Sequence, residues 1–160
     1  MTTTADKGIY GGITARLKAG SATGWGVFHP GSKTMILGGL MLIVSAFLPW
    51  VYLPFLEQVT GEVYALRGTD GPGVITLAVG FLAFAGGFVP RRKLAIAHAA
   101  IPGLLVAGIV LLQTWNILAF SASSGAWGGL LPGMGLVLAG GGAVILLKSS
   151  WNMYRTWQPA

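Results

Sequence analysis

The sequence predicts an all-α membrane protein: a four-helix bundle that crosses the bilayer four times, with both termini in the cytoplasm. Of the 160 residues, 54% are hydrophobic and only 9% are charged, whereas a soluble domain carries about 25% charged residues. The mean hydropathy is +0.73. Most of the surface is therefore expected to face lipid, and the basic residues fall almost entirely on one side of a four-span topology.

Four apolar runs are long enough to cross a membrane as helices. A bilayer core of about 30 Å needs about 20 apolar residues, with a usable range of about 17 to 25. None of the four runs contains Asp, Glu, Lys or Arg, and they do not alternate as the strands of a membrane barrel do. The sequence therefore predicts a transmembrane domain over residues 34–147, with spans at about 35–54, 73–89, 94–118 and 130–147.

The basic residues predict the orientation. Nine of the ten Lys and Arg residues precede the first run, join the second to the third, or follow the fourth, and only Arg67 lies in another connection. Because short cytoplasmic loops are enriched in Lys and Arg, segments 1–33 and 148–160 are expected in the cytoplasm of a bacterium, with the protein multi-pass in its plasma membrane. This distribution explains the net charge of +6 without nucleic-acid binding.

The N-terminal segment is basic and too short for a core of its own. Ile9, Ile13 and Leu17 recur every four residues beside basic side chains. Two interpretations fit this pattern: a short amphipathic helix lying on the anionic inner leaflet, or a basic tail without regular structure.

The connections between the runs carry local signals. The first run ends in "SAFLPWVYLPFLEQ", where Pro49 and Pro54 are expected to mark the exit from the membrane. In the outer connection, "EVYAL" alternates weakly and predicts half of a small hairpin, and Asp70-Gly71-Pro72-Gly73 is typical of a helix start. The four-residue link "PRRK" requires the second and third spans to be antiparallel neighbours.

Six aromatic residues lie near the predicted ends of the spans. Trp and Tyr are enriched at both membrane–water interfaces, because one part of each ring system is apolar and the other is polar. We therefore predict six interfacial anchors: Trp25, Trp50, Tyr52, Trp127, Trp151 and Trp157.

Small residues recur every four positions in the third and fourth runs. Such stripes let two helices approach closely, so that packing stabilises their association. We predict that these six residues form helix-packing contacts or a partner interface: Ala99, Gly103, Ala107, Gly135, Ala139 and Ala143.

Few residues are candidates for chemistry. His98, ahead of Pro102, is the only ionisable residue inside a span; we interpret it as a structural or interfacial residue, with a ligand or proton-carrier role as the alternative. Gln113 and Asn116 lie on one helix face and are expected to form hydrogen bonds between helices. No catalytic, cofactor-binding or metal-ligating residue is predicted, so we expect no enzyme activity, cofactor or metal. The chain has no cysteine, which excludes disulfides and thiolate metal sites.

Three stretches of the first half resemble a known group of proteins. "LGGLMLIVSAFLPWV", followed by "GTDGPGVITLAVGFLAF" and "PRRK", is similar over about residues 36–93 to small four-span integral membrane proteins of actinobacteria. That group is marked by a Pro-Trp end to the first helix and a D-G-x-G-x-I-T-L start to the second. The resemblance implies a topology and a bacterial source; it implies no activity, because the group is mostly uncharacterised.

The sequence favours a noncatalytic accessory or stabilising subunit of a larger membrane complex, such as a respiratory or cell-envelope assembly. Its expected partners are membrane lipids and other integral membrane subunits, with a homo-oligomer as a further possibility and no nucleic acid. The alternative is a homo-oligomeric pore or small-solute permeation protein of the holin type. A third hypothesis is an enzyme that uses Glu57, Glu62 or Asp70 at the outer surface.

Overall fold

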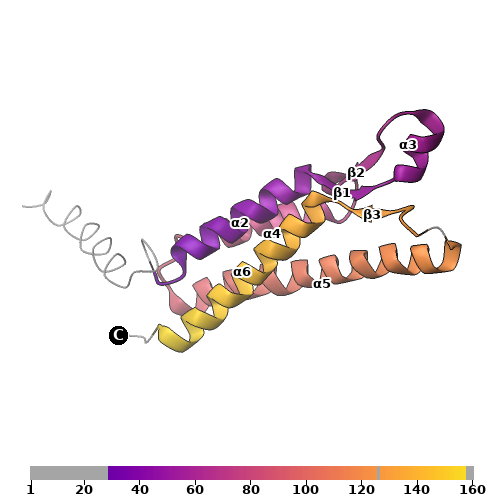
Figure 1. Cartoon of the computed structure of the whole chain (residues 1–160). Helices are drawn as coiled ribbons and strands as arrows, with labels where there is room; N and C mark the ends of the chain where they lie inside the picture. Colours follow the sequence, from indigo (N-terminus) through magenta and orange to yellow (C-terminus); the bar gives the residue numbers. More distant parts are fainter. Residues whose placement is uncertain (1–28, 126, 158–160) are drawn as a thin grey trace, which may run out of the picture.

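The computed structural model describes residues 29–125 and 127–157. The N-terminal pattern of Ile9, Ile13 and Leu17 and the predicted anchor Trp25 lie outside these residues. The described part is mostly helical, and its four longest helices run antiparallel to one another in chain order (Figure 1). They are α2 (Ser32–Phe47), α4 (Gly73–Gly86), α5 (Arg92–Ser124) and α6 (Met134–Thr156).

Helix α2 packs against both α4 and α6, while α5 packs mainly against α6. Glycines make the two contacts of α2 close. A Cβ atom added to Gly39 would lie 2.6 Å from the backbone nitrogen of Phe84 in α4, and one added to Gly38 would lie 2.9 Å from the side chain of Leu146 in α6. The core between the helices is built from small residues together with a few larger side chains, chiefly Met35, Leu42, Val106, Leu136, Leu146 and Met153.

Two helices, α5 and α6, are long and apolar enough to cross a membrane by length and composition. Helices α2 and α4 have 16 and 14 residues, or about 24 and 21 Å, and are shorter than a bilayer core. The predicted spans 35–54 and 73–89 are therefore helical over only part of their length. Helices α5 and α6 continue past the predicted ends of their spans, at 118 and 147.

Proline explains why α2 ends early. The residue before a proline is disfavoured in the helical region, because the proline ring contacts its backbone. Leu48, which precedes Pro49, is extended, with φ −85° and ψ 159°. The next four residues form strand β1 (Pro49–Tyr52), and Pro54 then begins the short helix α3 (Pro54–Thr60). Within the predicted span 35–54, the long helix therefore reaches only to Phe47, just before the Pro-Trp pair.

A small antiparallel sheet, which the all-α prediction did not include, closes this end of the mostly helical bundle. Its order is β2-β1-β3, with β2 at Ala65–Arg67 and β3 at Leu131–Pro132. Val51 is opposite Leu66 on one side and Pro132 on the other. The sheet thus joins the end of α2, the connection before α4 and the start of α6. The stretch "EVYAL" contributes Ala65 and Leu66 to β2, as the hairpin prediction required.

Helix α4 begins where the sequence indicated. The turn η1 (Gly68–Asp70) precedes it, and Asp70 accepts a hydrogen bond from the backbone N–H of Arg67 at 2.9 Å. Pro72 occupies the N-cap position of α4. We name the two ends of the bundle by their contents: the sheet end carries β1–β3 and α3, and the basic end carries the start of α2, the α4–α5 link and the end of α6 (Figure 1).

Candidate functional site at the basic end of the bundle

Cationic side chains collect at the basic end. Among the described residues, only Arg67 of the Lys and Arg side chains lies at the opposite, sheet end, where Glu57, Glu62 and Asp70 are also found (Figure 1). The bundle is therefore strongly polarised along its axis. The cations of the basic end are Lys33, Arg91, Arg92, Lys93, Lys148 and Arg155.

Two side chains from the start of α2 bind the last carbonyl groups of α4. The Oγ of Ser32 donates to the carbonyl of Gly87 at 2.7 Å, and Nε2 of His29 lies 3.1 Å from the carbonyl of Gly86. The final carbonyls of a helix have no partner within the helix. The Ser32 hydroxyl supplies one for Gly87, while the carbonyl of Gly86 also accepts a hydrogen bond from the backbone N–H of Val89 at 3.1 Å. The two side-chain bonds also join α2 to α4.

His29 is buried, with 2% of its surface exposed. Nδ1 accepts a hydrogen bond from the backbone N–H of Gly31 at 3.2 Å, so Nε2 carries the proton that is donated to Gly86. The imidazole stacks on Trp157, with ring centroids 5.3 Å apart. Burial lowers the pKa of His29, although the backbone hydrogen bonds to Gly86 and Gly87 act in the opposite direction. We therefore assign the neutral ring.

The start of α5 is bound to the end of α6 by Arg92. Its guanidinium donates to the carbonyl of Tyr154 at 2.7 Å and lies 5.9 Å from the centre of the tyrosine ring. The Nε of Arg92 is buried without a partner among the described residues. The basic end is thus held together by contacts between α2 and α4 and between α5 and α6.

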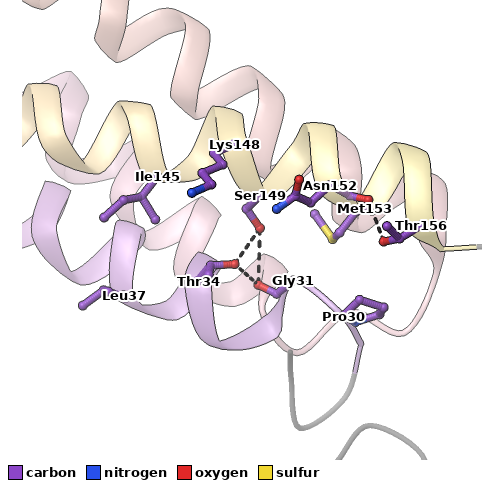
Figure 2. A pocket seen from close by; sticks show the side chains of 10 residues that line it. All are labelled: Pro30, Gly31, Thr34, Leu37, Ile145, Lys148, Ser149, Asn152, Met153 and Thr156. Atoms are coloured by element: carbon purple, nitrogen blue, oxygen red, sulfur yellow. Dashed lines mark hydrogen bonds between the residues drawn. The ribbon is translucent and has the colours of Figure 1, made fainter. Parts of the chain in front are cut away.

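A pocket of about 720 Å³ opens between α2 and α6 at the basic end (Figure 2). Thr34 donates to the carbonyl of Gly31 at 2.9 Å, and its Oγ1 lies 2.7 Å from Oγ of Ser149. Each hydroxyl has one proton to donate. The protons of Thr34 and Ser149 are therefore both used in the hydrogen bonds among these two hydroxyls and the carbonyl of Gly31. Lys148 and Asn152 flank Ser149 on α6 (Figure 2), and neither side chain has a hydrogen-bond partner within the described part of the chain. Leu37 and Ile145 form the apolar side of the pocket.

The chain has no significant match to a protein-family model, to a curated protein or to a solved structure. The resemblance to small actinobacterial membrane proteins therefore stays a prediction.

The predicted small-residue stripes are used inside this chain. Five of the six residues are buried, and Ala107 is half-buried against the core. A Cβ atom at Gly103 would lie 3.0 Å from the side chain of Leu147, and one at Gly135 would lie 2.5 Å from the ring of Trp50. The stripes thus lie where helices pack together within the chain. A partner would need a different face.

The predicted aromatic anchors have different surroundings. Trp127 and Trp151 are exposed, at 72% and 60%, whereas Trp157 and Tyr52 are half-buried. Trp50 is only 3% exposed, so its ring contacts protein and not lipid headgroups. This burial follows from β1, which turns the side chain inward over the end of α2.

The three polar candidates in α5 do not come together. Nδ1 of His98 lies 2.8 Å from the carbonyl of Leu94 one turn earlier, which is a local bond within the helix. The side chains of Gln113 and Asn116 form no hydrogen bond to another helix among the described residues; Asn116 is exposed. Within residues 29–125 and 127–157, no three His, Asp or Glu side chains are placed to hold a metal ion.

The sequence analysis did not single out the pocket residues. In the sequence, Lys148 contributes only to the predicted orientation, and no ligand is predicted for Thr34, Ser149 or Asn152. A spacing signal was present, because Ile145, Lys148, Ser149 and Asn152 repeat at three and four positions along one helix face. What the sequence did not reveal was that Thr34 of α2 lies opposite this face.

Proposed function

We propose that the chain is a noncatalytic, four-span integral membrane protein of the bacterial plasma membrane that acts as an accessory subunit of a larger membrane complex. The cations of the basic end support a cytoplasmic location for that end. Apolar side chains exposed around all four helices support contact with lipid; examples are Leu40, Phe81, Leu104 and Val137. In this topology the two short helices cross the bilayer with the help of the elements next to them at the sheet end. Strand β1 extends α2, and the turn η1 extends α4.

The length of α5 carries the proposal for a protein partner. Its 33 residues extend about 50 Å, whereas the bilayer core is about 30 Å thick. Residues 94–112 are sufficient to cross that core. We define the outer extension as α3 together with residues 113–124 of α5, which then lie beyond the hydrocarbon layer on the sheet side.

Lipid does not cover the outer extension, yet its surface is apolar. In α5, Trp115 is 69% exposed and Phe120 is 49% exposed; in α3, Phe55 and Val59 are 63% and 69% exposed. Exposed apolar groups of this kind, gathered in one region, mark interaction surfaces. A second integral membrane subunit, with an apolar surface just outside the bilayer, would remove these side chains from water.

An apolar pocket lies within the same surface. It measures about 240 Å³ and is lined by Leu53, Phe55 and Leu56 on the α3 side and by Phe120, Gly129 and Leu130 on the other. A pocket of this size accepts one large side chain. Buried aromatic or aliphatic anchors in such pockets contribute most of the binding energy of many interfaces, so this pocket supports the outer extension as the partner surface.

The test is affinity purification from native membranes with the full-length chain. We expect a stoichiometric partner to accompany the wild type and to be lost when Trp115→Ala and Phe55→Ala are combined. Leu104→Ala is the matched control, because Leu104 is 65% exposed but lies within the proposed bilayer. A wild-type protein that leaves native membranes as a lone monomer would overturn the proposal, as would equal loss of the partner in the control.

The alternative of a homo-oligomeric pore has less support. A pore needs a polar stripe along a span, but Ser45 is buried and donates to the carbonyl of Leu42 at 2.7 Å. Gln113 and Asn116 lie in the outer extension. Release of a dye from liposomes that contain the purified protein would establish the pore, and intact liposomes would exclude it.

A further inference from the structure

We propose that the pocket between α2 and α6 binds the phosphate headgroup of an anionic phospholipid of the inner leaflet, with the Lys148 ammonium and the Asn152 amide as its donors. The proposal rests on the four-span topology proposed above, which places the basic end at the inner membrane surface. It is independent of the protein partner, because the pocket and the outer extension lie at opposite ends of the bundle (Figure 1).

The space is suitable for such a ligand. Pockets that hold small molecules commonly measure about 300 to 1,000 Å³ and combine an apolar lining with a few polar groups. This pocket measures about 720 Å³ and has both kinds of wall. The volume is therefore sufficient for a headgroup with its glycerol.

The charge of the pocket favours an anion. The lining contains Lys148 and no Asp or Glu. The hydroxyls of Thr34 and Ser149 bond to each other and to Gly31, so the ammonium and the amide are the side-chain donors that remain for a ligand (Figure 2).

The apolar wall favours a lipid over free phosphate. Leu37, which is 53% exposed, and Ile145 continue from the polar groups toward the middle of the bundle. A ligand with a phosphate at one end and hydrocarbon at the other contacts both walls, whereas inorganic phosphate contacts only one. Basic pockets between transmembrane helices on the cytoplasmic side bind anionic headgroups in this way.

The test compares lipid binding to the delipidated full-length protein in neutral detergent by native mass spectrometry. The probes are phosphatidylglycerol, phosphatidylcholine and inorganic phosphate, each with the wild type, Lys148→Gln and Lys93→Gln. Lys93 is the matched control, since it is exposed at the same end but does not line the pocket. We expect phosphatidylglycerol to bind in preference to phosphatidylcholine. We also expect Lys148→Gln to weaken its binding about fivefold, the value for about 1 kcal/mol per basic residue, and Lys93→Gln to leave it unchanged.

Three results would overturn the proposal. They are equal binding of both lipids, equal loss in the two lysine variants, and full displacement of phosphatidylglycerol by millimolar inorganic phosphate, which would identify a free-phosphate site. If Lys148→Gln does not fold, Leu37→Trp replaces it; this change fills the apolar wall and leaves the charge intact, and retained lipid binding would then count against the proposal. No partner protein takes part, so failure here leaves the accessory-subunit proposal to its own test.

Discussion

The indole N–H of Trp50 donates a hydrogen bond to the backbone carbonyl of Ser45, at 2.8 Å. This bond folds β1 back over the last turn of α2. The ring also lies against two glycines, because a Cβ atom at either Gly68 or Gly135 would come within 2.5 Å of it. Trp50 therefore joins the end of α2 to the turn before α4 and to the start of α6.

We expect Trp50→Phe to destabilise the protein. The change removes the indole donor and leaves space beside Gly68 and Gly135, at a cost of about 1–2 kcal/mol. Thermal unfolding in detergent measures the effect. Trp127→Phe is the control, since Trp127 is 72% exposed and is expected to change stability by less than about 0.5 kcal/mol. Equal effects of the two changes would show that Trp50 does not hold the sheet end together.

We expect Gly39→Ala to separate α2 from α4. The added Cβ atom would lie 2.6 Å from the nitrogen of Phe84 and 2.8 Å from the carbonyl oxygen of Gly80. Backbone atoms of a helix cannot move aside as a side chain can, so we expect a loss of about 1–3 kcal/mol, the range for overpacked cores.

Gly108→Ala is the matched control for that change. Gly108 lies within α5, and apart from its chain neighbours and the backbone of its own helix no heavy atom of the described residues lies within 4 Å of its added Cβ. Alanine is favoured over glycine in helices by up to about 1 kcal/mol, so this variant is expected to match or exceed the wild type in thermal unfolding. If Gly39→Ala unfolded at the same temperature as the wild type, this result would contradict the close packing of α2 on α4.

The sequence predicted the positions of the four long helices because their apolar runs are uninterrupted. Hydropathy did not predict the end of α2, where the conformation is decided by Pro49 acting on Leu48. Hydropathy does not change at that point, because "PWVYL" is as apolar as the helix before it. A rule that considers residues before proline identifies the break, whereas a hydropathy window does not.

The tertiary contacts were harder to predict for a different reason. Spacing identified the stripes of α5 and α6, because their members repeat along one helix. The contact of Gly39 with α4 and the position of Thr34 opposite Ser149 depend on which helices are neighbours and on their relative height. Hydropathy and charge alone specify neither the pairing of the helices nor their relative height.

Acid is expected to destabilise the basic end through His29. Burial lowers the pKa of this ring below the ordinary value of 6.5, so the unfolded chain binds the proton more readily than the folded chain. The stability that depends on the neutral ring is therefore complete above about pH 6.5 and decreases as the pH falls toward the lowered pKa. Protonation also converts Nδ1 from an acceptor into a donor, which removes the bond from the N–H of Gly31.

The measurement is the melting temperature of the wild type and of His29→Gln between pH 5 and pH 8. We expect the wild type to lose stability toward pH 5 and the variant to lose less, because the variant has no group at this position that takes up a proton. A variant whose pH dependence equals that of the wild type would assign the acid sensitivity to other groups. At pH 8 the variant is expected to be the less stable of the two, since glutamine does not stack on Trp157 as the imidazole does.

Cysteine labelling tests the proposed topology directly, because the chain has no cysteine of its own. Glu62→Cys places a thiol at the sheet end, and Lys93→Cys places one at the basic end; both positions are exposed. With a membrane-impermeant maleimide on intact bacteria, we expect Glu62→Cys to be labelled at once and Lys93→Cys only after permeabilisation. The reverse result would invert the orientation. The proposed topology has one crossing between residues 62 and 93, so the two thiols must lie on opposite sides of the membrane. Labelling of both thiols in intact cells would place them on the same side and would contradict this topology.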